Sequence, residues 1–107
     1  MSYKIIATSF FEREVKALAK KHRSLKKDLS DLIEQLEKKP ATGTELGNNY
    51  YKIRLAISSK GKGKSGGARV ITHVHISNTT VYLLAIYDKS QMENISDTAI
   101  KERLNKL

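Results

Sequence analysis

The chain contains no cysteine, and its central segment contains no acidic residue. Without cysteine, neither a disulfide framework nor a thiolate metal site is possible. No segment approaches the roughly 18–20 apolar residues that cross a membrane, and no apolar N-terminal run indicates a signal peptide. We therefore expect a cytoplasmic protein with no membrane partner. Its 107 residues predict one domain, residues 1–107, with a single modest core.

The gap in acidic residues extends from Leu46 to Tyr87. Residues 1–45 carry ten basic and seven acidic side chains, residues 46–87 carry six and none, and residues 88–107 carry four and four. Two thirds of the net charge of +9 therefore belongs to the middle of the chain. A concentrated positive field attracts polyanions and accelerates their association, so nucleic acid is the first partner to consider.

Hydrophobic spacing in the first forty residues predicts a strand and two helices. Tyr3–Ala7 is rich in β-forming residues. Ser9 and Glu12 fit a capping box, which satisfies free backbone donors at the start of a helix, and we expect this helix to extend to about residue 22. Ser24 can cap a second helix, which Pro40 ends. The second helix has a clean apolar stripe formed by Leu25, Leu29, Leu32, Ile33 and Leu36.

The rest of the chain predicts three consecutive strands and a final helix. The strands are Tyr51–Ile57, Arg69–Ile76 and Thr80–Tyr87, an arrangement typical of an antiparallel meander. Ser96 can cap the last helix, and Ile95 is placed for a hydrophobic staple. The sequence thus predicts an α+β domain in the order βααβββα. We expect an N-terminal helical hairpin packed on a mainly antiparallel sheet, with the helices against one sheet face.

Alternation along the strands predicts a cationic sheet face. Side chains of a strand point alternately to its two faces. If the aliphatic sides meet the helical hairpin, four basic side chains converge on the opposite side: Lys52, Arg54, Arg69 and His73. Tyr87 and Lys89, at the end of the third strand, can reach the rim of this face. Cations beside an aromatic ring suit single-stranded nucleic acid. The alternative is a solvated outer sheet face that uses Lys and Arg to discourage edge pairing.

The segment Lys60–Arg69 matches two phosphate-binding patterns that do not apply here. Gly61–Gly66 matches G-x-G-x-x-G, and the overlapping Ser58–Ser65 matches a Walker A loop without its first glycine. Both motifs require a loop that opens a helix, whereas this segment leads into a predicted strand. We interpret it as a mobile basic loop whose Lys60, Lys62 and Lys64 hold RNA. The alternative is a flexible surface hairpin kept soluble by lysines.

His73 and His75 share a face, but no Cys, Asp or Glu lies nearby in sequence to complete a metal shell. We therefore predict no metal site and no cofactor. His73 can take part in acid–base chemistry or RNA binding, or it can be a packed or hydrogen-bonded histidine.

Two segments carry a family resemblance. They are Gly61–Ile71 (GKGKSGGARVI) and Val81–Lys89 (VYLLAIYDK), the second followed by Glu93–Ser96 (ENIS). Together with the order βααβββα, they closely resemble toxins of the RelE/ParE superfamily, in particular the HigB-like branch. The similarity spans nearly the whole chain. After Arg69-Val70-Ile71, however, HigB-like chains tend to have tyrosines, and here Thr72 and His73 follow.

The resemblance implies a type II toxin that a cognate antitoxin neutralises. It implies entry into the ribosomal A site and metal-independent cleavage of mRNA, in which the 2′-OH attacks the adjacent phosphodiester. By position, Arg69 matches the arginine of a central strand, Lys52 and Arg54 match basic strand residues, and Tyr87 and Lys89 match an aromatic-x-Lys position. We expect Arg69 to stabilise phosphate charge and Tyr87 to stack a base. The general base, a lysine of depressed pKa or a histidine, stays open.

Two other functions compete with this prediction. A ParE-like DNA gyrase inhibitor would share the fold but do no phosphodiester chemistry. A non-catalytic basic RNA-binding module would bind through the same cations without toxicity.

Overall fold

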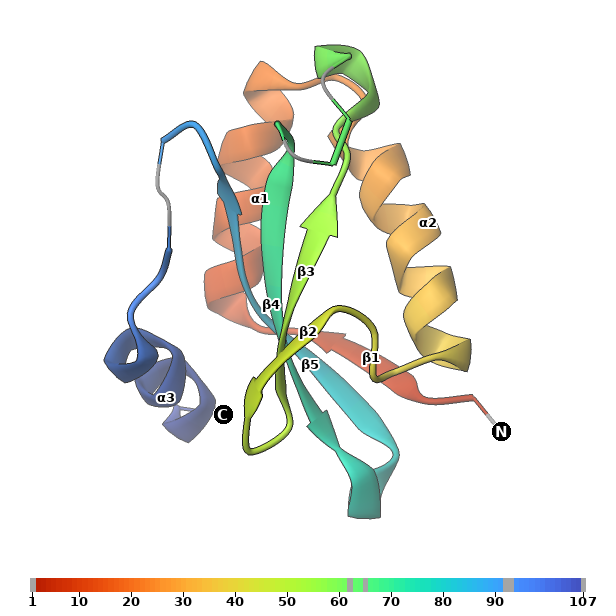
Figure 1. Ribbon diagram of the computed structural model, residues 1–107, viewed down its shortest axis with the longest axis vertical. Coiled ribbons are helices and arrows are strands. Elements are labelled where there is room, and N and C mark those ends of the chain that lie inside the picture. Colours follow the sequence, from red (N-terminus) through yellow and green to blue (C-terminus); the bar gives the residue numbers. More distant parts are fainter. Residues whose placement is uncertain (1, 62, 65, 92–93, 107) are drawn as a thin grey trace.

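The computed structural model describes residues 2–61, 63–64, 66–91 and 94–106 and confirms the predicted α+β fold (Figure 1). A five-stranded sheet has the order β1-β5-β4-β3-β2, in which β1 is parallel to β5 and the other pairs are antiparallel. The elements are β1 (Lys4–Ala7), α1 (Ser9–Lys21), α2 (Leu25–Lys38), β2 (Thr44–Gly47), β3 (Tyr50–Leu55), the 3₁₀ turn η1 (Ser58–Lys60), β4 (Ala68–His75), the 3₁₀ turn η2 (Ile76–Asn78), β5 (Thr80–Asp88) and α3 (Asp97–Asn105). No helix within these ranges is long and apolar enough to cross a membrane.

The predicted helix starts are partly correct. The cap of α1 is Thr8, not Ser9: the Thr8 side chain accepts a hydrogen bond from the backbone N–H of Phe11. Adjacent Thr and Ser are both good caps, so the sequence alone does not choose between them. Ser24 precedes α2 but makes no capping bond with its side chain. Ser96 caps α3 as predicted, accepting from the backbone N–H of Ala99.

The helical hairpin of α1 and α2 covers one sheet face, as predicted. Its apolar stripes, including Phe11, Leu18 and Leu25, are buried against aliphatic side chains of the three central strands. On the sheet side the buried residues are Ile53, Leu55, Ala68, Val70, Val74, Val81, Leu83 and Ile86. This layer forms the main core and fixes which side chains of β3, β4 and β5 point the other way.

The last helix corrects the expectation that all helices lie against one sheet face. Ile100 of α3 is buried on the face opposite the hairpin, with Ile71, Leu84, Ala85 and Tyr87. Leu104 of α3 and Ile95 before it pack against the same cluster. In Figure 1, α3 lies at the lower left, apart from α1 and α2. The predicted cationic face is therefore partly covered.

A β-bulge in β5 decides on which face Tyr87 lies. Before the bulge, Val81 and Leu83 point to the hairpin, and strict alternation of side chains along β5 would place Tyr87 on that same face. The register between β4 and β5 instead shifts after Thr72↔Leu83 to Ile71↔Ala85, which leaves Leu84 as the extra residue. Tyr87 consequently joins the cluster on the opposite face.

Side chains from α1 and α3 cover the edge of β5 where β1 has ended. Glu14 accepts from the backbone N–H of Ile86 at 3.3 Å, and Arg103 donates to the carbonyl of Leu84 at 2.9 Å. The two side chains also pair with each other, at 2.7 and 3.1 Å. This pair satisfies backbone groups of the exposed edge and anchors α3 to α1.

Candidate nucleic-acid interface

Three side chains predicted to form a site lie in one row across the sheet. Arg69 of β4 is the register partner of Arg54 in β3 and of Tyr87 in β5. Cross-strand partners have Cβ atoms about 4.5–5.5 Å apart. We call these three residues the Arg54–Arg69–Tyr87 row. Lys52 lies on the same face in the next row, where it is the partner of Ile71.

Arg69 is buried at the centre of this row. Only 3% of it is exposed, and its guanidinium donates to the carbonyl oxygens of Lys64 at 3.0 Å and Ala68 at 3.1 Å. An arginine stays charged at any physiological pH, so the row keeps a positive centre beneath the basic loop.

Tyr87 is packed inside the protein, with 6% of its surface exposed. Burial raises the pKa of its hydroxyl above the usual value, although the nearby charge of Arg69 acts in the opposite direction. The hydroxyl therefore stays protonated at neutral pH. In this conformation the ring offers little free surface on which a base can stack.

The two basic residues of β3 are more accessible than Arg69. Arg54 is exposed, and Lys52 is half-buried, with its ammonium 2.7 Å from the side-chain oxygen of Asn94. Asn94 precedes α3 and thus ties the far end of the chain to β3. A groove of about 530 Å³ lies beside β3 and α2, and its cationic lining residues are Lys52, Arg54 and Lys64.

The basic loop is anchored at Lys60 by a buried carboxylate that no sequence motif marks. Asp88, the last residue of β5, accepts from the Lys60 ammonium at 3.1 and 3.3 Å and lies 3.2 Å from His22. Ser90 donates to the same carboxylate with its N–H and its hydroxyl. Burial alone would raise the pKa of Asp88, but the bonds from Ser90 and Lys60 outweigh it and hold the pKa well below its usual range.

A second carboxylate holds the turn that precedes the loop. Asp28 of α2 accepts from the N–H and the hydroxyl of Ser58 and from the hydroxyl of Ser24. Burial works against ionisation of Asp28, and these bonds lower its pKa nonetheless. The loop therefore starts from a fixed position beside the α1–α2 connection, at the top of Figure 1.

The predicted loop lysines have different surroundings. Lys60 is paired with Asp88, and Lys64 is exposed. Lys62 lies outside the described residues. Lys89 is exposed beyond the end of β5, and its N–H donates to the carbonyl of Gly67. Lys89 therefore stands at the rim of the face, as predicted, beside the returning end of the loop.

His73 lies on the predicted face but far from the row. It lies four positions after Arg69 along β4, which is about 13 Å at about 3.3 Å per residue. Its ring makes an edge contact with Tyr50, at 4.6 Å between centroids. Burial lowers its pKa, and repulsion from His75 adds to this, while a hydrogen bond that the ring donates to the backbone of Asn48 opposes it. His73 is thus neutral at physiological pH.

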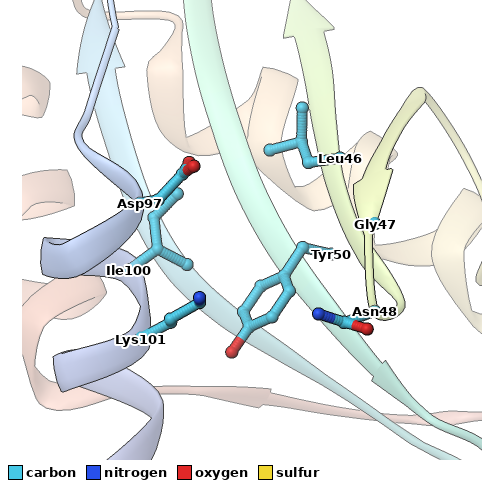
Figure 2. Close-up of a pocket in the computed structure, with 7 residues that line it drawn as sticks. All are labelled: Leu46, Gly47, Asn48, Tyr50, Asp97, Ile100 and Lys101. Carbon is cyan, nitrogen blue, oxygen red and sulfur yellow. The ribbon is translucent and has the colours of Figure 1, made fainter.

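Figure 2 shows a small pocket on the sheet face that carries the row, with Tyr50 lying between α3 and the β2–β3 turn. Its volume is about 90 Å³, well below the about 300 Å³ at the lower end of ligand-binding pockets. The pocket is therefore a seam between α3 and the β2–β3 hairpin and cannot hold a nucleotide.

A family profile described as the RelE toxin of the RelE/RelB toxin–antitoxin system matches residues 3–106. The chain belongs to the RelE family. The predicted superfamily is thus confirmed, and the likeness to the HigB-like branch stays a prediction. Among the described residues no group of three or more His, Asp or Glu side chains is arranged to hold a metal ion.

Solved structures of several toxins share the fold. A double mutant of E. coli toxin RelE in the free state superposes with a TM-score of 0.64 at 17% identity, covering 100% of this chain and 99% of that one. The RelBE2 toxin–antitoxin complex from Mycobacterium tuberculosis gives 0.61 at 15% identity over 82% and 99%. A metal-bound toxin from Helicobacter pylori gives 0.54 at 17% identity over 84% and 98%.

Proposed function

We propose that this RelE-family chain is a ribosome-dependent mRNA endoribonuclease that inhibits translation. The observation that carries the proposal is the Arg54–Arg69–Tyr87 row with Lys52 one step away, which gathers cations from separate strands on one sheet face. The family match and the lack of acidic residues from Leu46 to Tyr87 support an RNA substrate.

The proposed reaction is an internal transfer within mRNA. A general base takes the proton of a 2′-OH, the 2′-oxygen bonds to the adjacent phosphorus, and the bond from phosphorus to the 5′-oxygen breaks. The leaving 5′-oxygen takes up a proton. The products are a 2′,3′-cyclic phosphate and a 5′-hydroxyl end, and the step needs no metal.

Arg69 is the proposed stabiliser of the charge that builds on the phosphate. Its guanidinium donates to the neutral carbonyl of Lys64. A phosphate oxygen is a charged acceptor, and charge-assisted hydrogen bonds are roughly twice as strong as neutral ones. Substrate would therefore compete favourably for this donor.

Lys52 is the proposed partner in proton transfer, and Arg54 positions the substrate. An arginine is always charged and cannot easily serve as a base. His73 lies about 13 Å along the strand from Arg69, too far to act on the same phosphodiester. Lys52 is closer and is oriented by Asn94.

The remaining predicted residues take supporting roles in this proposal. Lys64 and Lys89 are exposed and contact RNA phosphates, whereas Lys60 chiefly anchors the loop to Asp88. Tyr87 is buried beside Arg69 and supports its position. Base stacking by Tyr87 would require the ring to become more exposed.

A cognate antitoxin is the proposed protein partner. The matched family is defined by a toxin–antitoxin system, and structures with the same fold include toxin–antitoxin complexes.

Primer extension on mRNA from cells that express the protein tests the proposal. We expect growth arrest and new 5′ ends within translated codons, and no cuts when translation initiation on that message is blocked. DNA damage without mRNA cuts would contradict the proposal and indicate a DNA gyrase inhibitor instead. Unaffected growth and an absence of mRNA cuts would also contradict it and would indicate a non-catalytic RNA-binding module.

A further inference from the structure

A second cluster of cations lies on the helical hairpin, away from the Arg54–Arg69–Tyr87 row. A hollow of about 410 Å³ where α1 meets the connection to α2 is lined by Ala19 and four basic residues. We call these four the hairpin basic patch: Lys16, Lys20, Arg23 and Lys26. All four are exposed.

The patch and the row lie on opposite sides of the molecule. The hairpin buries Leu18 of α1 and Leu25 of α2 against the sheet, so Lys16 and Lys20 on the other side of α1 point away from it. The row lies on the sheet face that the hairpin does not cover. An RNA strand on the row leaves the patch free.

The free protein does not neutralise the patch. Lys16 and Lys20 are four residues apart on α1, a spacing at which like charges repel. Lys26 lies in the first turn of α2, where the helix dipole disfavours a cation. Among the described residues, the cations of the ion pairs are His22, Lys27, Lys60 and Arg103, none of which belongs to the patch.

We propose that the hairpin basic patch binds the phosphate backbone of folded ribosomal RNA. The proposal rests on the proposed function for the identity of this RNA. A protein partner fits the patch less well, because protein interfaces depend on buried aromatic or aliphatic anchors, and Ala19 is the only apolar residue among the described residues that line the hollow. Neutralisation of phosphates requires only closely placed cations.

Two RNA contacts on opposite sides give a reason for dependence on the ribosome. Free mRNA fills only the sheet face, whereas a ribosome presents folded RNA to the patch at the same time. Joining the two contacts makes the second intramolecular and raises the overall affinity.

Matched charge variants test the patch. The triple variant K16Q/K20Q/K26Q removes three patch lysines, and K4Q/K38Q/K39Q removes three exposed lysines at the opposite end of the hairpin and on β1. Binding of each purified protein to small ribosomal subunits is measured over a series of salt concentrations. Thermal unfolding of both variants checks that they are folded.

We expect the patch variant to bind small subunits about tenfold or more weakly than the wild type near 0.1 M salt. The slope of its log affinity against log salt concentration should fall by the equivalent of about two to three phosphate contacts. The control variant should lose less than about threefold. Equal losses in both variants, or no loss in the patch variant, would overturn the proposal. So would intact subunit binding combined with weakened antitoxin binding. Because no readout requires cleavage, a catalytically inactive wild type would refute the proposed function and leave this result standing.

Discussion

The ammonium of Lys60 lies 3.1 Å from a carboxylate oxygen of Asp88, and both side chains are largely buried. Asp88 immediately follows Tyr87 of the row, and Lys60 immediately precedes the glycine-rich part of the basic loop. This ion pair therefore ties the loop to the end of the strand that carries Tyr87.

Replacing Asp88 with Asn should destabilise the fold by about 2–3 kcal/mol, because it leaves the buried ammonium of Lys60 without its charged acceptor. Urea unfolding measures the change. The matched control is Asp31→Asn, which breaks an exposed pair with Lys27 and should cost less than about 0.5 kcal/mol. Equal effects of the two substitutions would contradict a structural role for Asp88.

The lowered pKa of Asp88 predicts loss of stability in acid. A carboxyl whose folded pKa lies below its unfolded value, about 3.9, stabilises the fold above that pH and loses this contribution as the pH falls below it. The wild-type protein should therefore unfold more easily as the pH drops from 5 to 3, and Asp88→Asn should weaken this dependence. The pH dependence of the urea midpoint is the measurement, and an unchanged slope in the variant would count against it.

Arg69→Ala should reduce mRNA cleavage by about 100-fold to 1,000-fold, the typical cost of removing one donor that stabilises transition-state charge. Ribosome binding should change little, since the exposed cations remain. Primer extension and cosedimentation with ribosomes provide the two measurements. Arg69→Lys keeps the charge but not the paired donors and should recover only part of the activity. Parallel loss of binding and cleavage would argue against a catalytic role.

Gly67→Ala should be strongly destabilising, by about 2 kcal/mol or more, because an added side chain here meets rigid backbone. A Cβ at this position would lie 2.1 Å from the carbonyl oxygen of Leu55 in the neighbouring strand. Gly61→Ala is the control: its Cβ would meet nothing within 4 Å, and only the strain of its positive φ, +69°, remains. Thermal unfolding compares the two, and similar midpoints would show that the approach of β3 to the loop is looser than described.

His73 should make stability depend on pH as the pH falls from about 7 through about 6.5. Its folded pKa is lowered by burial and by His75, so the unfolded chain takes up a proton first as the pH falls through about 6.5. Stability should fall over this range and do so less steeply in His73→Gln. Urea unfolding at several pH values tests this. If His73→Gln keeps the wild-type dependence of stability on pH, His73 is not the source of that dependence.

The central strands and the cationic face were predictable because alternation along β3 and β4 is a local property. Lys52 and Arg54 alternate with Ile53 and Leu55 in the sequence, and the structure keeps this pattern. The short strand β2 was not predicted. Of its residues, Thr-Glu-Leu-Gly, Thr favours strands but Glu and Gly do not, and the segment becomes a strand because β3 supplies a partner.

The surroundings of the site residues depend on contacts between distant segments. In the sequence Asp88 follows the predicted strand Thr80–Tyr87 and begins a polar run, and nothing local predicts that Lys60 and His22 contact its buried carboxylate. The burial of Arg69 and Tyr87 likewise depends on the loop and on α3, which approach from other parts of the chain. Sequence patterns predicted which residues share the face but not how accessible each one is.

Because Leu84 is an extra residue in β5, odd-numbered side chains before it and after it point to opposite faces of the sheet. A substitution at an odd-numbered position before it alters the helix-facing core, whereas the same change after it alters the cation-bearing surface. An alignment that deletes or shifts this one position would assign Tyr87 to the wrong side of the molecule. The roles of residues in distant relatives should therefore be transferred by superposing the backbones and not by aligning the sequences alone.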